Sequence, residues 1–325
     1  MKNSGEKIFI AGASGMVGSA ILRILRKRKL KNKKEIDPVL IPTRKELDLT
    51  NSVDVDQWFK KNQPRIVIIA AAKVGGIYAN FSKPADFILE NIKIQTNLIE
   101  SSFRNKVKRL LFLGSSCIYP KYSRQPIKEE YLLQGGLEST NEAYAIAKIS
   151  GIKLCESFRT QYGFDAISLM PTNLYGPNDN YDENNSHVMA SLIKKICNAK
   201  KNSEKSVICW GSGDPLREFM HVDDLARGVL FALENWFPDD IKSPRYNNGM
   251  PLNFLNIGSG EEISIRDLSK LICRLVKYQG EIIWDSSKPD GTPRKLLDSS
   301  RIKSLGWKTK ITLEDGIKKT ISEFL

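Results

Sequence analysis

The chain has 325 residues, 41% of them hydrophobic, and its 50 Lys and Arg outnumber its 37 Asp and Glu to give a formal net charge of +13. This length and composition predict one large α/β unit, or a main domain with a smaller partner, and exclude a fibre or a disordered chain. The longest apolar stretch near the middle, residues 66–72, is too short to cross a bilayer, and the polar start at 1–7 shows no secretory signal. We therefore expect a cytoplasmic protein without a membrane partner.

The positive charge is scattered, apart from a basic run at 23–34 that resembles a helix end and its following loop, where cations suit the carbonyl dipole and solvent. We interpret this run as solvated surface and expect no nucleic-acid partner, although an anionic small molecule and RNA both remain open. The five cysteines are odd in number, widely spaced and lack a C-x-x-C pair, so we expect reduced thiols and no metal site.

In the first half, apolar strands alternate with helical segments. Because the strands are continuous apolar runs, they predict a parallel sheet covered on both faces, with all strand exits at one edge. Strands are predicted at 7–11, 38–42, 65–71, 108–116 and from 165, with helices at 19–27, 53–63, 85–105 and 141–163.

After Pro177 the alternation becomes irregular. Residues 179–187 look like a polar loop, and the predicted elements that follow are a helix at 187–201, a strand–turn–strand–helix run at 206–236, a strand at 252–258, a helix at 261–278 that Ser264 would cap, a strand at 282–284, a loop at 286–298 and a final helix. The fold class predicted is α/β, a Rossmann-type doubly wound parallel sheet with a smaller interleaved substrate domain. The predicted division is a dinucleotide-binding domain at 1–175, to which 218–260 return, and a substrate-binding domain at 176–217 and 261–325.

The sequence GASGMVG follows the first strand and opens the first helix. In this context Gly12 permits a tight turn, Gly15 lets the backbone approach a pyrophosphate, and Gly18 allows close packing of the helix, whose N-terminus faces the phosphates. The motif predicts a dinucleotide site.

The end of the second strand, IPTRKELD, indicates which dinucleotide is bound. NAD sites usually place an acid there to hold the ribose hydroxyls, but Arg44 occupies this region, and a guanidinium favours the 2′-phosphate of NADP. Asp48 lies further on, where it would reach the adenine. We therefore expect NADPH/NADP as the cofactor.

Three residues form a pattern typical of hydride transfer. Tyr144 and Lys148 lie four residues apart on a predicted helix and so share one face. An unperturbed tyrosine, with a pKa of about 10, is a poor acid–base group at neutral pH unless a nearby positive charge lowers that value. Ser115 ends the preceding strand and would bond the substrate oxygen, which completes a serine–tyrosine–lysine set.

With these residues in place, the chain resembles the extended short-chain dehydrogenase/reductases that act on nucleotide sugars, and among them the GDP-L-fucose synthases. The resemblance covers nearly the whole chain. The motifs that carry it are GMVGSAI, AAAKVGGI, LLFLGSSCIYPK, EAYAIAKI, MPTNLYGP, NSHV, WGSG, REFMHVDD and SKPDGTPRKLLD.

The resemblance implies a two-part reaction on GDP-4-keto-6-deoxy-D-mannose, in which C3 and C5 are epimerised and the C4 ketone is then reduced with NADPH. Each inversion needs a base on one face of the sugar and an acid on the other. Cys117 is implied as the base and His187 as the opposing acid, although which of them acts at each carbon stays open. His221, in REFMHVDD, is expected to be structural.

The resemblance also implies the residues that hold the two ligands. Those expected at the cofactor are Gly12, Ser14, Gly15, Met16, Val17, Gly18, Arg44, Asp48, Leu49, Ala71, Leu113, Gly114, Ser116, Tyr144, Lys148, Pro171, Asn173, Leu174 and His187. Those expected at the GDP-sugar are Ser116, Lys195, Trp210, Arg217, Asp290 and Lys295. Relatives often carry arginine at the position of Ser14, so the preference for NADPH is expected either to be weaker or to rest on Arg44 alone, unless the basic insertion before Asp37 compensates. A homodimer through the helices at 85–105 and 141–163 is likewise implied.

Two alternatives remain. One is a neighbouring activity, a nucleotide-sugar 4-epimerase or 4,6-dehydratase; the dehydratases usually need a carboxylate near the serine, where this chain has Cys117. The other is a non-catalytic, reductase-like protein that binds RNA or senses redox state. The net charge favours this second reading, and the intact serine–tyrosine–lysine set argues against it.

Overall fold

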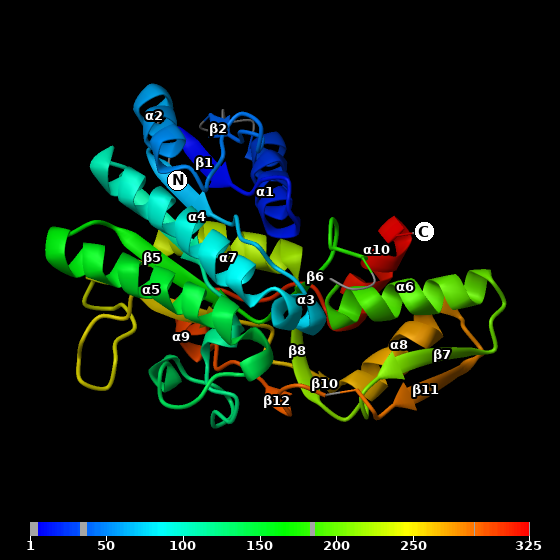
Figure 1. Cartoon of the computed structure of the whole chain (residues 1–325). Helices are drawn as coiled ribbons and strands as arrows, with labels where there is room; N and C mark the ends of the chain where they lie inside the picture. Colours follow the sequence, from blue (N-terminus) through cyan, green and yellow to red (C-terminus); the bar gives the residue numbers. More distant parts are fainter. Residues whose placement is uncertain (1–5, 33–37, 183–185, 289, 325) are drawn as a thin grey trace.

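The computed structural model of the chain describes residues 6–32, 38–182, 186–288 and 290–324 (Figure 1). Several sequence features lie partly outside these ranges: the polar start at 1–5, the end of the basic run and the insertion at 33–37, the centre of the polar loop at 183–185, and residue 289 in the loop at 286–298.

A six-stranded sheet forms the larger part of the molecule, with strand order β2-β1-β3-β4-β5-β9 and every pairing parallel. β1 lies between β2 and β3 in the sheet. The chain therefore goes from β1 to β2 on one side and then crosses to β3 and β4 on the other, and doubly wound sheets bind ligands at the point where the strand order reverses in this way. The strands are β1 Ile8–Ala11, β2 Val39–Leu40, β3 Ile66–Ile69, β4 Arg109–Leu113, β5 Ala166–Pro171 and β9 Phe254–Ile257.

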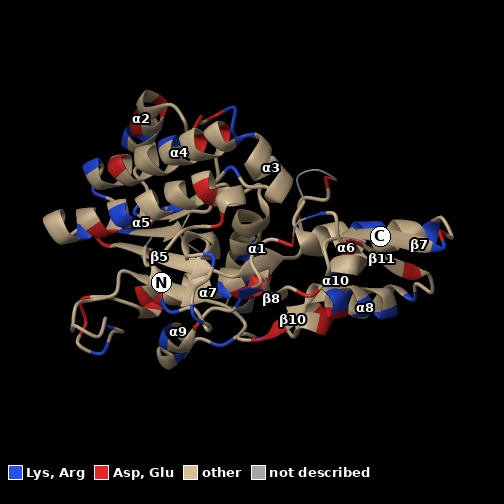
Figure 2. Ribbon diagram, turned by 60° about the horizontal axis from the view of Figure 1, so that its bottom comes forward, with Lys and Arg blue, Asp and Glu red and all other residues tan. Residues whose placement is uncertain are grey.

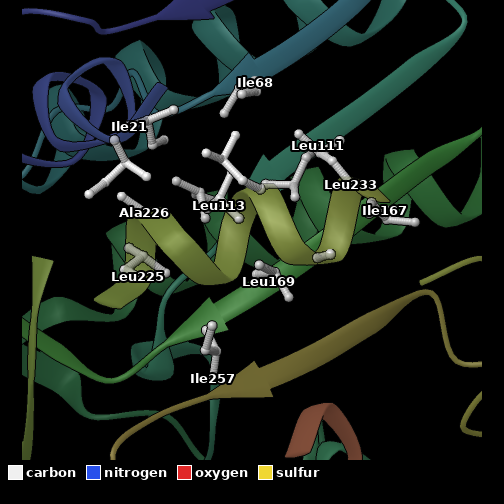
Figure 3. Packing of buried hydrophobic residues seen from close by; sticks show 14 of the residues in the cluster. Ile21, Ile68, Leu111, Leu113, Ile167, Leu169, Leu225, Ala226, Leu233 and Ile257 are labelled. Carbon is white, nitrogen blue, oxygen red and sulfur yellow. The ribbon is translucent and has the colours of Figure 1, made fainter. Parts of the chain in front are cut away.

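Helices cover both faces of this sheet. Helices α1 (Met16–Asn32) and α7 (Val222–Asn235) lie on one face, and α2 (Ser52–Asn62), α4 (Pro84–Arg104) and α5 (Glu142–Tyr162) lie on the other. Figure 3 shows how α7 packs Leu225, Ala226 and Leu233 against the strands.

Successive residues of a strand point to opposite faces, and the two hydrophobic clusters follow this rule. In β1, Ile8 and Ile10 belong to the cluster under α1 and α7, whereas Phe9 and Ala11 belong to the cluster under the other three helices. The strands are therefore apolar throughout, as the sequence indicated, and the predicted Rossmann-type fold is confirmed.

The second part of the molecule lies beside the carboxyl edge of the sheet (Figure 1). Its hydrophobic cluster joins α6, α8 and α10 to two small sheets, one with order β10-β8-β12 and β6 beside β8, the other with β7 parallel to β11. These elements are β6 Asn173–Tyr175, α6 Val188–Lys201, β7 Ser206–Trp210, β8 Leu216–His221, β10 Glu262–Ser264, α8 Ile265–Val276, β11 Glu281–Asp285, β12 Arg294–Lys295 and α10 Leu313–Phe324.

Some local features differ from the sequence-based expectation. Residues 262–264, predicted as the start of a helix, form β10 because they pair with β8, and Ser264 then caps α8 by accepting a hydrogen bond from the Asp267 amide at 3.0 Å. Two short helices were not predicted, α3 (Ile77–Ser82) and α9 (Ser300–Ser304). Ile302 of α9 packs with the clusters of the large sheet, while Ile317 of α10 packs in the third cluster.

Lys and Arg positions alternate with Asp and Glu positions along the ribbons of α2, α4 and α5 in Figure 2. In the part of the chain that the structure describes, no helix is both long and apolar enough to cross a membrane.

Candidate active site

The glycine turn between β1 and α1 has the geometry of a phosphate cradle. Gly12 has φ +82°, and a Cβ there would lie 2.7 Å from the Ala71 backbone; a Cβ on Gly18 would lie 2.1 Å from the Gly12 carbonyl oxygen. Gly15 differs, because a Cβ there would meet only that oxygen at 3.5 Å, and both Ser14 and Gly15 are exposed. The turn therefore presents open backbone at the N-terminus of α1, which fits a dinucleotide pyrophosphate.

The residues expected at the adenosine end lie after β2. Arg44 is exposed, and its positive charge contributes to the environment of Asp48. The Asp48 carboxylate accepts hydrogen bonds from the amide and hydroxyl of Thr50 at 2.9 and 2.8 Å, which lower the pKa of Asp48 below its usual value. Asp48 thus orders its own turn, and Arg44 is the exposed cation beside it.

The remaining residues expected at the cofactor lie at the carboxyl ends of the central strands or just after them. Parallel strands bring these ends to one edge of the sheet, so the segments that follow β1, β3, β4 and β5 converge there. Ala71 follows β3; Leu113 ends β4 and leads into Gly114 and Ser116; Pro171 ends β5; Asn173 and Leu174 lie on β6; Leu49 follows Asp48, and Met16 and Val17 open α1.

The Tyr144–Lys148 pair lies on α5 beside the end of β4. Lys148 is buried and donates a hydrogen bond from Nζ to the Leu113 carbonyl oxygen at 2.9 Å, while Nζ lies 5.8 Å from the centre of the Tyr144 ring. Burial lowers the pKa of Lys148 to about 7. Burial also raises the pKa of Tyr144 above the usual tyrosine value, and a side-chain hydrogen bond with Ser115 opposes this shift. Tyr144 is therefore a protonated phenol at neutral pH.

Cys117 lies in a short 3₁₀ turn, Ser116–Ile118, that directly follows β4. Ser115 caps this turn, since its hydroxyl accepts a hydrogen bond from the Cys117 amide at 3.2 Å. Two side chains from distant segments contact the sulfur, Asn141 with Nδ2 at 3.4 Å and Lys295 with Nζ at 3.8 Å. The thiol is half-buried and lies among hydrogen-bond donors.

His187 occupies the N-cap position of α6, but its side chain makes no capping hydrogen bond. The imidazole is partly exposed to solvent, yet neighbouring segments crowd it; this crowding, together with the positive charge of Lys295, lowers the pKa of His187 below its usual value. His221 is by contrast buried and caps α7 by accepting a hydrogen bond from the Asp223 amide at 3.1 Å, in keeping with the structural role expected of it.

Of the residues expected at the GDP-sugar, Arg217 and Lys295 are neighbours on paired strands, β8 and β12. Arg217 is largely enclosed, and its positive charge acts on Cys117. Ser116 is buried beside Cys117. These residues form one group with the cysteine.

The other three residues expected at the GDP-sugar lie on α6, at the end of β7 and in the loop before β12. Lys195 donates to the Ile208 carbonyl oxygen at 3.0 Å, and Trp210 is 57% exposed, so its ring is open to stacking. The Asp290 carboxylate accepts hydrogen bonds from the Ser212 amide and hydroxyl at 2.7 and 2.9 Å, so it braces the turn after β7.

Sequence reasoning missed Asn141, which precedes α5 and contacts the Cys117 sulfur. The only signal was a polar side chain three residues before Tyr144, next to the start of the helix. It also missed Glu218, whose buried carboxylate accepts hydrogen bonds from the Gly260 and Leu297 amides at 2.7 and 3.0 Å.

A glycine-turn dinucleotide cradle beside a tyrosine–lysine pair defines a Rossmann-type oxidoreductase. Residues 8–249 match the model of the NAD dependent epimerase/dehydratase family, and the chain belongs to this family.

The chain is 51% identical to GDP-L-fucose synthase 1 of Arabidopsis thaliana, over 100% of this chain and 95% of that protein. It is 48% identical to GDP-L-fucose synthase of Escherichia coli, over 99% and 97%. Among solved structures, the GDP-mannoheptose C4 reductase MlghC of Campylobacter jejuni, with NADP bound, aligns with a TM-score of 0.86 at 38% identity, over 100% and 99%. These relatives confirm the resemblance that the motifs indicated.

Proposed function

We propose that this protein converts GDP-4-keto-6-deoxy-D-mannose to GDP-L-fucose, by epimerising C3 and C5 and then reducing the C4 ketone with NADPH. The single observation that carries the proposal is the convergence of Ser115, Cys117, Tyr144 and Lys148 at the carboxyl end of β4, in the same sheet whose strand β1 leads into the glycine turn. The whole-chain identity to GDP-L-fucose synthases supports it.

In the epimerisation steps, Cys117 takes a proton from a carbon next to the C4 ketone, and the electron pair moves onto the carbonyl oxygen. His187 returns a proton to the opposite face of that carbon. The Ser115 hydroxyl holds the carbonyl oxygen as charge develops on it. Reduction must come last, because it removes the ketone that makes both C–H bonds acidic.

For the reduction, NADPH bound at the glycine turn would supply the hydride for C4. Tyr144 gives its phenolic proton to the C4 oxygen, and its protonated state at neutral pH suits this task. Lys148 lies beside the ring and stabilises the phenolate that remains. The glycine turn would hold the pyrophosphate of the cofactor, with Arg44 at its 2′-phosphate. Arg217 would hold the substrate diphosphate and Trp210 the base.

Incubation of the protein with GDP-4-keto-6-deoxy-D-mannose and NADPH in deuterated water tests the proposal. We expect loss of NADPH absorbance, formation of GDP-L-fucose, and deuterium at both C3 and C5 of the product. Absence of NADPH consumption would overturn the synthase assignment.

A second candidate is reduction of C4 alone, because a C4 reductase aligns over the whole chain. It predicts NADPH consumption without deuterium at C3 or C5. The donors that surround Cys117 favour the synthase, since a reductase needs no base at that position.

We also propose that the protein works as a homodimer in the cytoplasm and binds no nucleic acid. Leu89 on α4 and Ile146 on α5 are exposed apolar residues on the two helices expected at the dimer interface. All five cysteines are unpaired, as in a reducing compartment. Analytical sedimentation should give twice the chain mass if the protein is a dimer. Salt-sensitive binding of RNA would contradict the proposal that it binds no nucleic acid.

A further inference from the structure

The sulfur of Cys117 is contacted by two groups that can only donate hydrogen bonds. These are the Asn141 amide nitrogen at 3.4 Å and the Lys295 ammonium at 3.8 Å. A neutral thiol is a weak acceptor, whereas a thiolate carries a full charge that two such donors satisfy. The oxygen of the Asn141 amide points elsewhere, and in the part of the chain that the structure describes it is buried without a hydrogen-bond partner. The orientation of the amide is thus the one that a thiolate requires.

The charges around the sulfur act in the same direction. Two cations, Lys295 and Arg217, face it from adjacent strands. Among the described residues, the titratable and charged groups nearby are Lys295 on β12, Arg217 on β8, Tyr144 on α5 and His187 at the start of α6. Two carboxylates also lie in this region: Glu138 is paired with Lys121 at 3.0 Å, and Asp290 accepts hydrogen bonds from the Ser212 amide and hydroxyl. Both carboxylates therefore already have partners of their own.

The position of Lys295 is fixed by the backbone on either side of it. Glu218 accepts a hydrogen bond from the Leu297 amide at 3.0 Å, and Gln125 accepts one from the Leu296 amide at 2.9 Å. Gln125 also donates to the Arg294 carbonyl oxygen at 3.1 Å. Because three consecutive peptide groups are held in this way, β12 delivers the lysine to a defined place.

The cysteine turn is held equally firmly. Tyr119, two residues after Cys117, is buried and donates a hydrogen bond to the Asn256 side-chain oxygen at 2.6 Å. The Asn256 side chain in turn donates to the Ile127 carbonyl oxygen at 2.9 Å, and its backbone amide donates to the buried Glu129 carboxylate at 2.9 Å. The contact between Lys295 Nζ and Cys117 Sγ therefore joins two well-anchored segments, β12 and the turn that carries Cys117.

We propose that Lys295, assisted by Asn141, holds Cys117 as a thiolate in the free enzyme and is a positioning residue for proton abstraction. Lys295 keeps its proton throughout: the C–H proton moves to the sulfur, and the electron pair moves to the ketone oxygen. This assigns Lys295 to the epimerisation steps, a more specific role than the GDP-sugar contact that the resemblance implied. The inference rests on the proposed function for its catalytic meaning, but the contact itself can be tested without substrate.

The test measures how fast iodoacetamide alkylates Cys117 as a function of pH, with no cofactor or substrate present, and mass spectrometry identifies the modified peptide. We expect Lys295→Met to slow alkylation at pH 7 roughly tenfold and to move the rise of the rate to higher pH, because a cation next to the sulfur is lost. Lys295→Arg should restore most of the wild-type rate. Asn141→Asp should also slow alkylation relative to the wild type, because it places a carboxylate against the sulfur.

Lys270→Met is the matched control, because Lys270 is an exposed lysine on α8 paired with Asp267. It should alkylate like the wild type, and circular dichroism should show every variant folded. Coincident pH profiles for wild type, Lys295→Met and Lys295→Arg would overturn the inference, even if the wild type incorporates deuterium into its substrate. A shifted profile in a protein that incorporates no deuterium would overturn the proposed function instead and would still support the thiolate contact.

Discussion

Tyr144 is placed so that its phenol serves one half of the reaction. Its ring packs edge-on against Phe87, with the ring centres 6.5 Å apart, and burial keeps the hydroxyl protonated. Tyr144→Phe should preserve this packing and remove only the proton donor. We expect NADPH oxidation to fall about 10²–10⁴-fold while deuterium still enters C3 and C5. Absorbance and mass spectrometry on the same sample would measure both effects.

Cys117→Ala is the converse variant and serves as its control. It should lose deuterium incorporation but still consume NADPH when it is given the ketone already epimerised. If both variants lost both activities to the same extent, the separation of the two steps by residue would be wrong.

The environment of His187 predicts a specific pH dependence. Crowding and Lys295 lower its pKa in the free enzyme, so less of the acid form is present as pH rises. A bound diphosphate would add negative charge nearby and raise that pKa again. We therefore expect the falling limb of deuterium incorporation to lie at lower pH in kcat/KM than in kcat, because these parameters report the free and the bound enzyme.

His187→Gln keeps a hydrogen-bonding side chain that does not titrate, and it should reduce the rate of incorporation by about 10²-fold or more and abolish that limb. Two limbs at the same pH in the wild type would contradict the assigned coupling between His187 and the substrate charge.

At the level of single residues, the sequence predicted those site residues that lie close to one another along the chain. Tyr144 and Lys148 share a helix face and Ser115 ends the preceding strand, so their spacing suggested the set, whereas the role of Cys117 came from the family resemblance. Asn141 and Lys295 could not be found in the same way, because their meeting at the sulfur depends on β12 pairing with β8, across 178 residues of chain between Lys295 and Cys117.

Among the elements, the turn between β1 and α1 offers a matched pair of variants. Gly15→Ala places its Cβ in ordinary contact with the Gly12 oxygen, 3.5 Å away, so it should leave stability unchanged and weaken NADPH binding, by roughly tenfold or more, because the methyl obstructs the phosphate approach. Gly18→Ala places its Cβ 2.1 Å from the Gly12 oxygen and should destabilise the fold by about 1–3 kcal/mol.

Thermal unfolding without cofactor and titration of NADPH fluorescence separate the two effects. Equal loss of stability in both variants would show that Gly15 serves packing, and unaltered NADPH affinity in Gly15→Ala would remove the turn from the cofactor site.

The long elements were predictable because each is a continuous apolar strand or a helix with a regular buried face. The short ones were not. β12 has two residues and α3 has six, too few for a period to register, and β10 owes its form to the neighbouring β8 rather than to its own sequence. Lys295, the site residue that lies on β12, was accordingly predicted only through the family resemblance.

For the whole molecule, Asp223 ties three helices together. It accepts hydrogen bonds from Arg23 on α1 and from Lys319 on α10 while it lies in the first turn of α7. Burial alone would raise its pKa, but the bonds from Lys319 and Arg23 outweigh this and lower the pKa of Asp223 to about 2. An unfolded aspartate titrates near about 3.9, so the tie stabilises the protein above that pH and is lost as pH falls toward about 2.

Asp223→Asn should therefore reduce the free energy of unfolding at pH 7 by about 2 kcal/mol and flatten its decline between about pH 4 and pH 2. Urea denaturation at a series of pH values would measure both. Glu281→Gln, at an exposed position on β11, is the control and should change neither. Parallel curves for wild type and Asp223→Asn would contradict the role of this tie.

The chain crosses several times between the two parts of the molecule, and hydrogen bonds connect the parts where it crosses. β6 leaves the large sheet to pair with β8, and the buried Asp224 of α7 accepts the amides of Lys310 and Ile311 at 3.0 and 2.9 Å. Such a molecule cannot be divided into exchangeable modules. Any attempt to graft the sugar preference of another enzyme onto this one should replace loops such as 286–293, because exchange of the entire smaller half would sever the strand pairing that places sulfur, phenol and cations around one another.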